Sequence, residues 1–318
     1  MALSARGGPP TTKAAGRIGQ RKEALAGYSF VAIPMVFFLV LSVGVLFYAL
    51  FISLWKWNIR SGPQRFIGID NYTRILGDPL FQTAVKNSLY YALVWVPLTM
   101  ALGLFLAVIV NQKIRGQTFF RSTFYFPAIA SSAAITILWV FIIAPDGLFN
   151  SVRGALGLNP IFSFLGFTPN QDWIGNYKTA MNSVIILNTW TTSGTFMLFY
   201  LASLQSISND IYEAAAIDGA TAWQNFRYVT FPLLRPAHFF VATVGIIGAL
   251  QLFDQAYIAG GSDGSPVNSL MTIVLYLYSA LFKRLDPGYA AAVGIVLFVI
   301  IFSATLAQRR IFGSAPTW

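Results

Sequence analysis

The amino-acid sequence predicts an all-α membrane protein with six transmembrane helices. Of its 318 residues, 56% are apolar and only 10% are charged, whereas a soluble domain carries about 25% charged residues. A chain with so few polar side chains cannot cover an ordinary globular surface. This composition excludes an ordinary cytosolic enzyme, a disordered protein and a fibrous protein.

Six segments are long enough and apolar enough to cross a bilayer, which takes about 20 mostly apolar residues. The segments are free of Asp, Glu, Lys and Arg and cover residues 28–55, 87–112, 122–145, 179–209, 236–253 and 287–308. The fifth is expected to continue past Asp254 to residue 258. The first is too long for the apolar region of a signal peptide, so it is interpreted as a true span.

The basic residues indicate how these spans are oriented. They gather before the first span, between the second and third spans, and after the sixth: Arg6, Lys13, Arg17, Arg21, Lys22, Lys113, Arg115, Arg121, Arg309 and Arg310. The positive-inside rule therefore predicts that both termini are cytoplasmic. This pattern accounts for the net charge of +10 without a nucleic-acid partner.

The predicted organisation has four parts. Residues 1–22 are expected to be a disordered cytoplasmic tail, and residues 23–83 hold the first span and an outside loop. Residues 84–310 form the membrane core, and residues 311–318 form a second cytoplasmic tail.

The residues that most enzymes need are sparse or scattered. The chain has no Cys and a single histidine, His238, which excludes thiol catalysis and histidine metal clusters. It also lacks the glycine-rich phosphate loop that ends in Gly-Lys-Ser/Thr. The candidate acids are spread over separate predicted outside loops: Asp70, Asp78, Asp146, Asp172, Asp263 and Asp286. General acid–base catalysis needs paired groups within reach, so we predict no catalytic residue and no metal site.

The predicted cytoplasmic loop at residues 206–236 carries the most specific pattern. Asp210 and Glu213 have the spacing of a capping box, and Gly219 is suited to a left-handed helix end. Trp223, Phe226 and Val229 then recur every three residues, which predicts a second short helix with an apolar stripe. Pro232 and Pro236 redirect the chain toward the fifth span. The loop is either packed on its own bundle or covered by a partner.

This loop resembles a known motif. Glu213-Ala-Ala, Asp218-Gly-Ala, Phe226 and Pro232 have the spacing of the EAA loop in permease subunits of binding-protein-dependent ABC importers. Further stretches resemble the carbohydrate-uptake branch, especially its maltose-permease-like first subunit: residues 66–72, 119–127, 146–150 and 252–254 with Gly260 and Gly261. The resemblance covers residues 28–310. It implies a type I importer transmembrane domain whose ATPase-coupling residues are Glu213, Ala214, Ala215, Asp218, Gly219, Ala220, Phe226 and Pro232.

The resemblance also implies a set of partners. A second permease completes the pore as a heterodimer, two cytoplasmic ATPase subunits bind the coupling helices, and an extracytoplasmic binding protein delivers the substrate. The permease itself is then no enzyme and binds no cofactor, since ATP and Mg are used by the ATPase. The expected location is the inner (cytoplasmic) membrane of a prokaryote, with multiple passes through the bilayer.

Polar side chains within the fourth and fifth spans mark a candidate substrate pathway. They lie at helical spacings in each span and comprise Asn188, Thr191, Thr192, Thr195, Gln251, Asp254 and Gln255. Buried polar groups in membranes usually face the bundle interior or a water-filled path. With Trp190 and Phe253 nearby, they suit a sugar, which needs hydrogen-bonding groups and aromatic faces. Alternatively, the Thr residues serve helix packing, and Asp254 lies at the outer interface.

The substrate class follows from charge. Residues 184–203 and 239–253 contain no Lys or Arg, so a neutral carbohydrate is favoured over an anion. The resemblance adds that Asn188 matches an asparagine of the maltose pocket, whereas other polar positions of that pocket fall on Gly245, Ala249 and Leu252. A different sugar is therefore expected. The alternatives are an importer of glycerol-3-phosphate or a related polyol phosphate, and an ion-coupled secondary sugar transporter.

Overall fold

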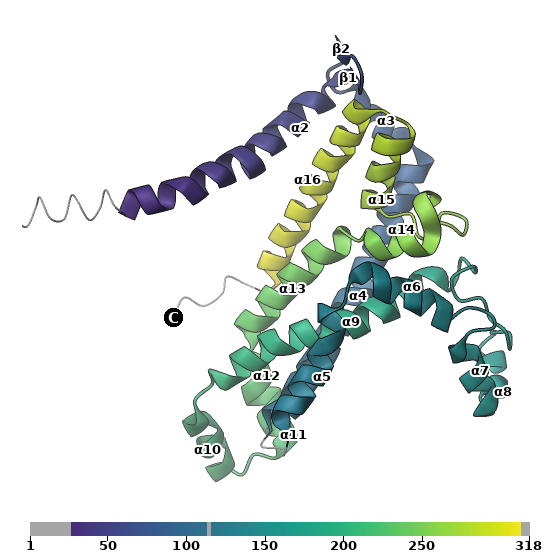
Figure 1. Ribbon diagram of the computed structural model, residues 1–318. Coiled ribbons are helices and arrows are strands. Elements are labelled where there is room, and N and C mark those ends of the chain that lie inside the picture. The colour runs from purple at the N-terminus through teal and green to yellow at the C-terminus, as the bar shows by residue number, and fades with distance from the viewer. Residues whose placement is uncertain (1–26, 113–115, 313–318) are drawn as a thin grey trace, which may run out of the picture. The chain divides into compact units, whose positions relative to one another are not determined.

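A computed structural model describes residues 27–112 and 116–312 of the chain, and most of these residues are helical (Figure 1). The chain forms two units that divide after Phe51. The predicted tail at 1–22, the predicted cytoplasmic Lys113 and Arg115, and most of the predicted tail at 311–318 lie outside the described residues.

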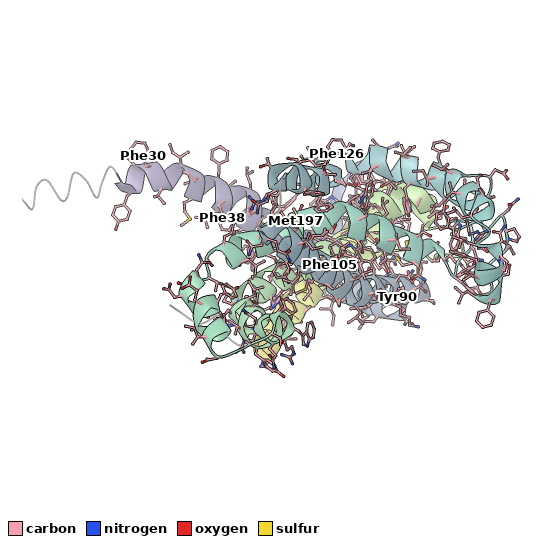
Figure 2. All side chains as sticks on the ribbon, turned by 90° about the horizontal axis from the view of Figure 1, so that it is seen from below. Phe30, Phe38, Tyr90, Phe105, Phe126 and Met197 are labelled. Atoms are coloured by element: carbon pink, nitrogen blue, oxygen red, sulfur yellow. The ribbon has the colours of Figure 1, made fainter. Side chains whose placement is uncertain are left out.

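The described part of the first unit is an apolar helix within the span Gly27–Ser53. It contains a π-helical segment, η1 (Leu39–Gly44), followed by α2 (Val45–Ser53). Its side chains project in all directions, and Phe30 and Phe38 are 82% and 56% exposed (Figure 2). A helix that is apolar on all sides is typical of a membrane span. The first predicted span is therefore confirmed.

The second unit contains the remaining elements (Figure 1). A two-stranded antiparallel hairpin comes first and pairs Trp55 with Phe66. In chain order the elements are β1 (Trp55–Asn58), β2 (Gly62–Phe66), α3 (Asp70–Gly77), α4 (Pro79–Asn111), α5 (Gln117–Ile129), α6 (Ser132–Ile142), α7 (Leu148–Ala155), α8 (Asn159–Phe164), α9 (Ala180–Gln205), α10 (Asn209–Ile217), α11 (Ala222–Asn225), η2 (Phe226–Thr230), α12 (Phe231–Leu233), α13 (Arg235–Leu250), α14 (Asp254–Gly260), η3 (Gly261–Asp263), α15 (Ile273–Tyr278), η4 (Ser279–Lys283) and α16 (Pro287–Phe312).

The core of the second unit is centred on α9, which packs against α4 and α5. Met197 and Tyr200 of α9 are fully buried. Two glycines bring the helices close together. A Cβ atom on Gly103 of α4 would lie 2.7 Å from the Cβ of Phe196, and one on Gly194 of α9 would overlap the backbone carbonyl of Phe124 in α5. Small residues at such seams let membrane helices pack backbone to backbone.

Two predicted spans are interrupted. The third was expected as one helix over 122–145, but α5 and α6 meet at an angle of 93°. The break falls at Ala130 and Ser131, which have extended backbone. Pro127 lies just before it and cannot donate a helical hydrogen bond, so the last turn of α5 is weakened. A charge-free run does not reveal such a break.

The fifth span also leaves the helical conformation, between the end of α13 at Leu250 and the start of α14 at Asp254. The freed carbonyl of Leu252 accepts a hydrogen bond of 2.7 Å from the Thr272 hydroxyl. A backbone group at membrane depth needs such a partner, because lipid offers none. Thr272 is the N-cap of a short apolar helix at residues 273–283. This helix was not predicted.

A polar cluster joins α4, α15 and α16 at the end of the bundle that carries the hairpin. Asp78 caps α4 by accepting the backbone N–H groups of Leu80 and Phe81. Its other oxygen accepts the Tyr276 hydroxyl at 2.6 Å, and Arg284 lies 3.4 Å away. Burial alone would raise the pKa of Asp78, but these hydrogen bonds outweigh it and hold the pKa below the ordinary value of 3.8.

Asp78 should make stability depend on acid pH. Because its pKa is lowered in the folded protein, the carboxylate stabilises the fold above the ordinary pKa, and this contribution is lost as the pH falls through the folded value. The thermal unfolding midpoint of the wild type should therefore drop more steeply below about pH 4 than that of Asp78→Asn. Equal slopes in detergent-solubilised protein would contradict the role assigned to Asp78.

The close approach of α9 and α5 predicts a strong effect for one methyl group. Gly194→Ala places a Cβ against the Phe124 carbonyl, so the helices must separate, and overpacking of this kind costs about 1–3 kcal/mol. Gly248→Ala in α13 is the matched control, because none of the described residues lies within 4 Å of its Cβ position. Thermal unfolding should show a lower midpoint for the first variant only.

Candidate substrate cavity and coupling segment

A cavity of about 440 Å³ lies among α4, α5, α6, α9, α13 and α14. Its volume falls within the range of small-molecule sites, about 300–1,000 Å³. All seven residues of the predicted pathway line it: Asn188, Thr191, Thr192, Thr195, Gln251, Asp254 and Gln255. The structure thus brings together residues from two spans that the sequence could only treat separately.

On the α9 side of the cavity, some polar side chains are hydrogen-bonded within the protein and others are not. Asn188 is 5% exposed, and its amide donates a 2.7 Å hydrogen bond to the Tyr91 hydroxyl of α4. Thr191 donates its hydroxyl to the backbone of its own helix, at the carbonyl of Asn188, as the packing alternative expects. Thr192 and Thr195 are half-buried on the same wall.

The opposite side is built at the break between α13 and α14. Gln251 and Asp254 are exposed toward the cavity, and Asp254 opens α14, where a carboxylate is favourable beside the helix N-terminus. The Gln255 amide donates a 2.9 Å hydrogen bond to the Ser132 hydroxyl at the start of α6. The expectation that these residues share one face of a continuous helix was therefore wrong, because the helix is interrupted between Leu250 and Asp254.

Aromatic rings form a third wall. Tyr91 and Trp95 stack with their ring centres 5.5 Å apart, and Phe253 lines the cavity from the break. Trp190, which was expected beside the polar groups, does not line the cavity and is 49% exposed. Tyr91 and Trp95 were missed. Their spacing with Thr99, every four residues along α4, was the available signal for a shared face.

The charge of the lining is low. Asp254 is the one acidic residue among the described residues that line the cavity, and none of them is Lys or Arg. The cavity therefore offers amide, hydroxyl and carboxylate groups together with aromatic faces, but no cation.

The predicted helix-turn-helix at 206–236 is present, with a different N-cap. The first helix, α10, begins after Ser208, whose hydroxyl accepts the N–H of Asp210. The proposed Asp210–Glu213 capping box is therefore wrong, because Ser208 already has extended backbone and caps the helix two residues earlier. A capping box exists instead between Thr221 and Gln224, where the second helical segment starts.

The end of α10 follows the prediction for Gly219. This residue has φ +76°, in the left-handed region. Its N–H donates to the carbonyl of Ala216, and the N–H of Ala220 donates to the carbonyl of Ala215. These are the two bonds of a Schellman motif. The turn fixes the angle at which the chain leaves α10.

The coupling residues inferred from the resemblance lie in this segment. Glu213, Ala214 and Asp218 are exposed on α10 and its cap, and Ala215 and Ala220 are half-buried. Phe226 is half-buried in η2, and Pro232 lies in the first turn of α12. Ile217 and Trp223 are 88% and 69% exposed, so part of the apolar surface of the segment is not covered by the described residues of this chain.

Comparison with known proteins identifies the family. Residues 99–313 match the family described as "Binding-protein-dependent transport system inner membrane component". The chain is 32% identical over 288 residues to the probable ABC transporter permease protein YurN of Bacillus subtilis. The matched region covers 90% of this chain and 95% of that protein. The chain belongs to the family of inner membrane components of binding-protein-dependent transport systems.

Two relatives have named substrates. The arabinooligosaccharides transport system permease protein AraP of Bacillus subtilis is 33% identical, over 96% of this chain and 95% of that protein. The lactose transport system permease protein LacF of Rhizobium radiobacter is 34% identical, over 86% of this chain and 90% of that protein. These are substrates of the relatives.

A solved structure has the same fold. It is a chain of a bacterial ABC transporter for import of the acidic polysaccharide alginate, with a TM-score of 0.79 and 20% identity over 95% of this chain and 100% of that chain. The described residues include five apolar helices of membrane length, or six when the bent α5–α6 pair counts as one span, so the protein is an integral membrane transport component. The type I importer fold predicted from the sequence is confirmed.

Access to the cavity can be tested by cysteine labelling, because the native chain has no Cys. Single cysteines at 191, 192 and 195 should react with a charged, water-soluble thiol reagent, since these positions line the cavity. Ser193→Cys is the matched control on the same helix, because Ser193 is 4% exposed and lies outside the lining. Equal inertness at all four positions in the assembled transporter would remove α9 from the pathway.

Proposed function

We propose that this chain is the membrane-spanning permease subunit of an ATP-driven importer and forms half of the pathway for a neutral sugar. The observation that carries the proposal is the cavity itself. Amide and hydroxyl groups from α9 and from the α13–α14 break face one space that also holds the stacked Tyr91 and Trp95. Sugars present hydroxyl groups on their edges and CH groups on their faces, which suit such a lining.

The charge of the cavity supports a neutral substrate. A phosphate or carboxylate at this depth would face a desolvation cost of several kcal/mol without a cationic partner. The lining supplies Asp254, which repels an anion, and no Lys or Arg. AraP and LacF, whose names specify arabinooligosaccharides and lactose, support the carbohydrate class. The glycerol-3-phosphate alternative draws no support from the lining.

The proposed partners follow from family membership and from the exposed coupling segment. A binding protein outside the membrane delivers the sugar, and a second permease supplies the other half of the pathway. Two cytoplasmic ATPase subunits bind MgATP and contact α10, so this chain hydrolyses nothing and holds no cofactor. The exposed Ile217 and Trp223 support docking of the ATPase at this segment, because exposed apolar side chains on a loop are typical of a protein–protein contact.

In this proposal α10 and both termini face the cytoplasm of a prokaryotic cell, and the hairpin end faces outward. The positive-inside distribution supports this orientation. Asn188, Thr192 and Gln251 then contact the sugar during passage. Glu213, Asp218 and the Gly219 turn transmit ATPase closure to the spans.

The substrate class is tested with the complete importer, reconstituted with its ATPases, second permease and binding protein. ATP hydrolysis should rise with neutral mono- or oligosaccharides and stay at its basal rate with glycerol-3-phosphate. Asn188→Leu should weaken the response to sugar, because Leu cannot offer a hydrogen bond. Stimulation by glycerol-3-phosphate and by none of the sugars would overturn the neutral-sugar proposal.

The coupling role is tested at Gly219. Apart from the adjoining backbone, none of the described residues lies within 4 Å of a Cβ at this position, so a larger side chain leaves the packing of this chain intact. Gly219→Leu must still hold a left-handed backbone, at a cost of about 1–2 kcal/mol, and projects toward the proposed ATPase surface. We expect insertion into the membrane to persist and transport to be lost.

Gly219→Asn is the matched control, because Asn accepts the left-handed conformation. It should retain most of the transport activity and ATPase binding. Normal uptake by Gly219→Leu would contradict the assignment of this turn to the coupling surface.

A further inference from the structure

A second cavity lies between α4 and α13, and residues of η2 and α12 also line it. Its volume is about 800 Å³, larger than that of the substrate cavity, and most of its lining is apolar. Pro97, Ala101 and Leu104 line it from α4, and Ala242 and Ile246 line it from α13. The Tyr200 hydroxyl at the edge of this space lies 3.0 Å from the ring of His238 and is thereby engaged.

This cavity faces away from the substrate cavity. On α13 the substrate cavity is lined by Val244 and Gly248, whereas the second cavity is lined by Ala242 and Ile246. Positions two residues apart on a helix differ by about 200° in direction. If the substrate cavity faces the pathway, the second cavity therefore faces the surroundings of the complex.

Two arginines lie at one end of the apolar lining. Arg235 is the first residue of α13 and of its membrane span, and Arg227 precedes it in η2. Both side chains are exposed and line the cavity. The stretch from Arg235 to Ile246 measures about 16 Å at 1.5 Å per residue. That is about half of the roughly 30 Å hydrocarbon core, the depth of one leaflet.

We propose that the second cavity binds an anionic phospholipid of the cytoplasmic leaflet. One acyl chain lies along α4 and α13 over Ala101, Leu104 and Ile246, and the phosphate contacts Arg227 and Arg235. Basic pockets between membrane helices on the cytoplasmic side recognise such head groups. The assignment to the cytoplasmic leaflet rests on the orientation given under the proposed function.

The site adjoins the coupling segment. Pro232 of the coupling segment also lines the cavity, so a bound lipid contacts both the segment that meets the ATPase and the span that forms the substrate cavity.

Photo-crosslinking tests what fills the cavity. Ala101→Cys is labelled with a photoreactive group in the complete transporter, in membranes, with partner subunits free of reactive cysteine. The expected product is an adduct with phospholipid. Thr195→Cys, in the substrate cavity, is the matched control and should give no phospholipid adduct. An adduct between position 101 and the second permease would overturn the proposal, because a partner helix would then occupy the space.

The contribution of the two arginines to lipid binding is measured by native mass spectrometry of the purified complex with added phosphatidylglycerol. The double variant Arg227→Gln/Arg235→Gln should hold this lipid about 30-fold more weakly, equivalent to about 2 kcal/mol for two arginines near a membrane surface. The matched control is Arg309→Gln/Arg310→Gln, which removes two exposed arginines at the end of α16. It should bind phosphatidylglycerol as the wild type does.

Ala101→Trp supplies an independent variant, because its indole obstructs the apolar part of the cavity and both arginines are kept. It should also lose the bound phosphatidylglycerol. Wild-type lipid retention in both the Arg227/Arg235 variant and Ala101→Trp would overturn the proposal. These measurements report lipid occupancy and do not depend on transport, so they fail independently of the sugar-import proposal.

Discussion

Every backbone N–H and C=O at membrane depth must find a partner inside the protein, because lipid offers none. In most of this chain, helical hydrogen bonds supply these partners. Where a helix is interrupted, side chains must supply them instead. The α5–α6 and α13–α14 breaks both fall beside the cavity. There, Thr272 satisfies the carbonyl of Leu252, and Gln255 bonds to Ser132 at the start of α6. Interrupted helices, polar side chains and a cavity thus occur together for one physical reason.

The same helices connect the cavity to the surface segment at 206–236. The α9 helix carries Asn188 in the cavity and ends at Gln205, four residues before α10 begins. The α13 helix begins directly after α12 and ends at the break that holds Gln251. A displacement of α10 and α12 would therefore move α9 and α13, which carry the two polar walls of the cavity. The chain changes direction at the Gly219 turn and at the α12–α13 junction.

Span positions could be predicted from the sequence because bilayer thickness imposes a length on any apolar run. The polar residues of the cavity could be predicted because such groups are costly in lipid. The breaks could not, since the α5–α6 junction makes contacts with distant parts of the chain, such as the hydrogen bond that Ser132 accepts from Gln255. Tyr91 and Trp95 were missed because their four-residue spacing with Thr99 indicates a shared face of α4 but does not say whether that face lies against a cavity or against lipid. The N-cap of α10 was misplaced by two residues because Ser208 and Asp210 are both good caps.

The seam at Gly194 determines where the cavity wall is able to open. There, α9 and α5 meet backbone to backbone, and such packing resists separation because many van der Waals contacts would be lost together. Across the cavity, α14 packs against α6, and Gln255 donates a hydrogen bond to the Ser132 hydroxyl there, a bond worth about 0.5–1.5 kcal/mol. A gate placed at the α6–α14 junction would open by exchanging that bond for one to water or to a substrate hydroxyl, while α5 and α9 move as one rigid body.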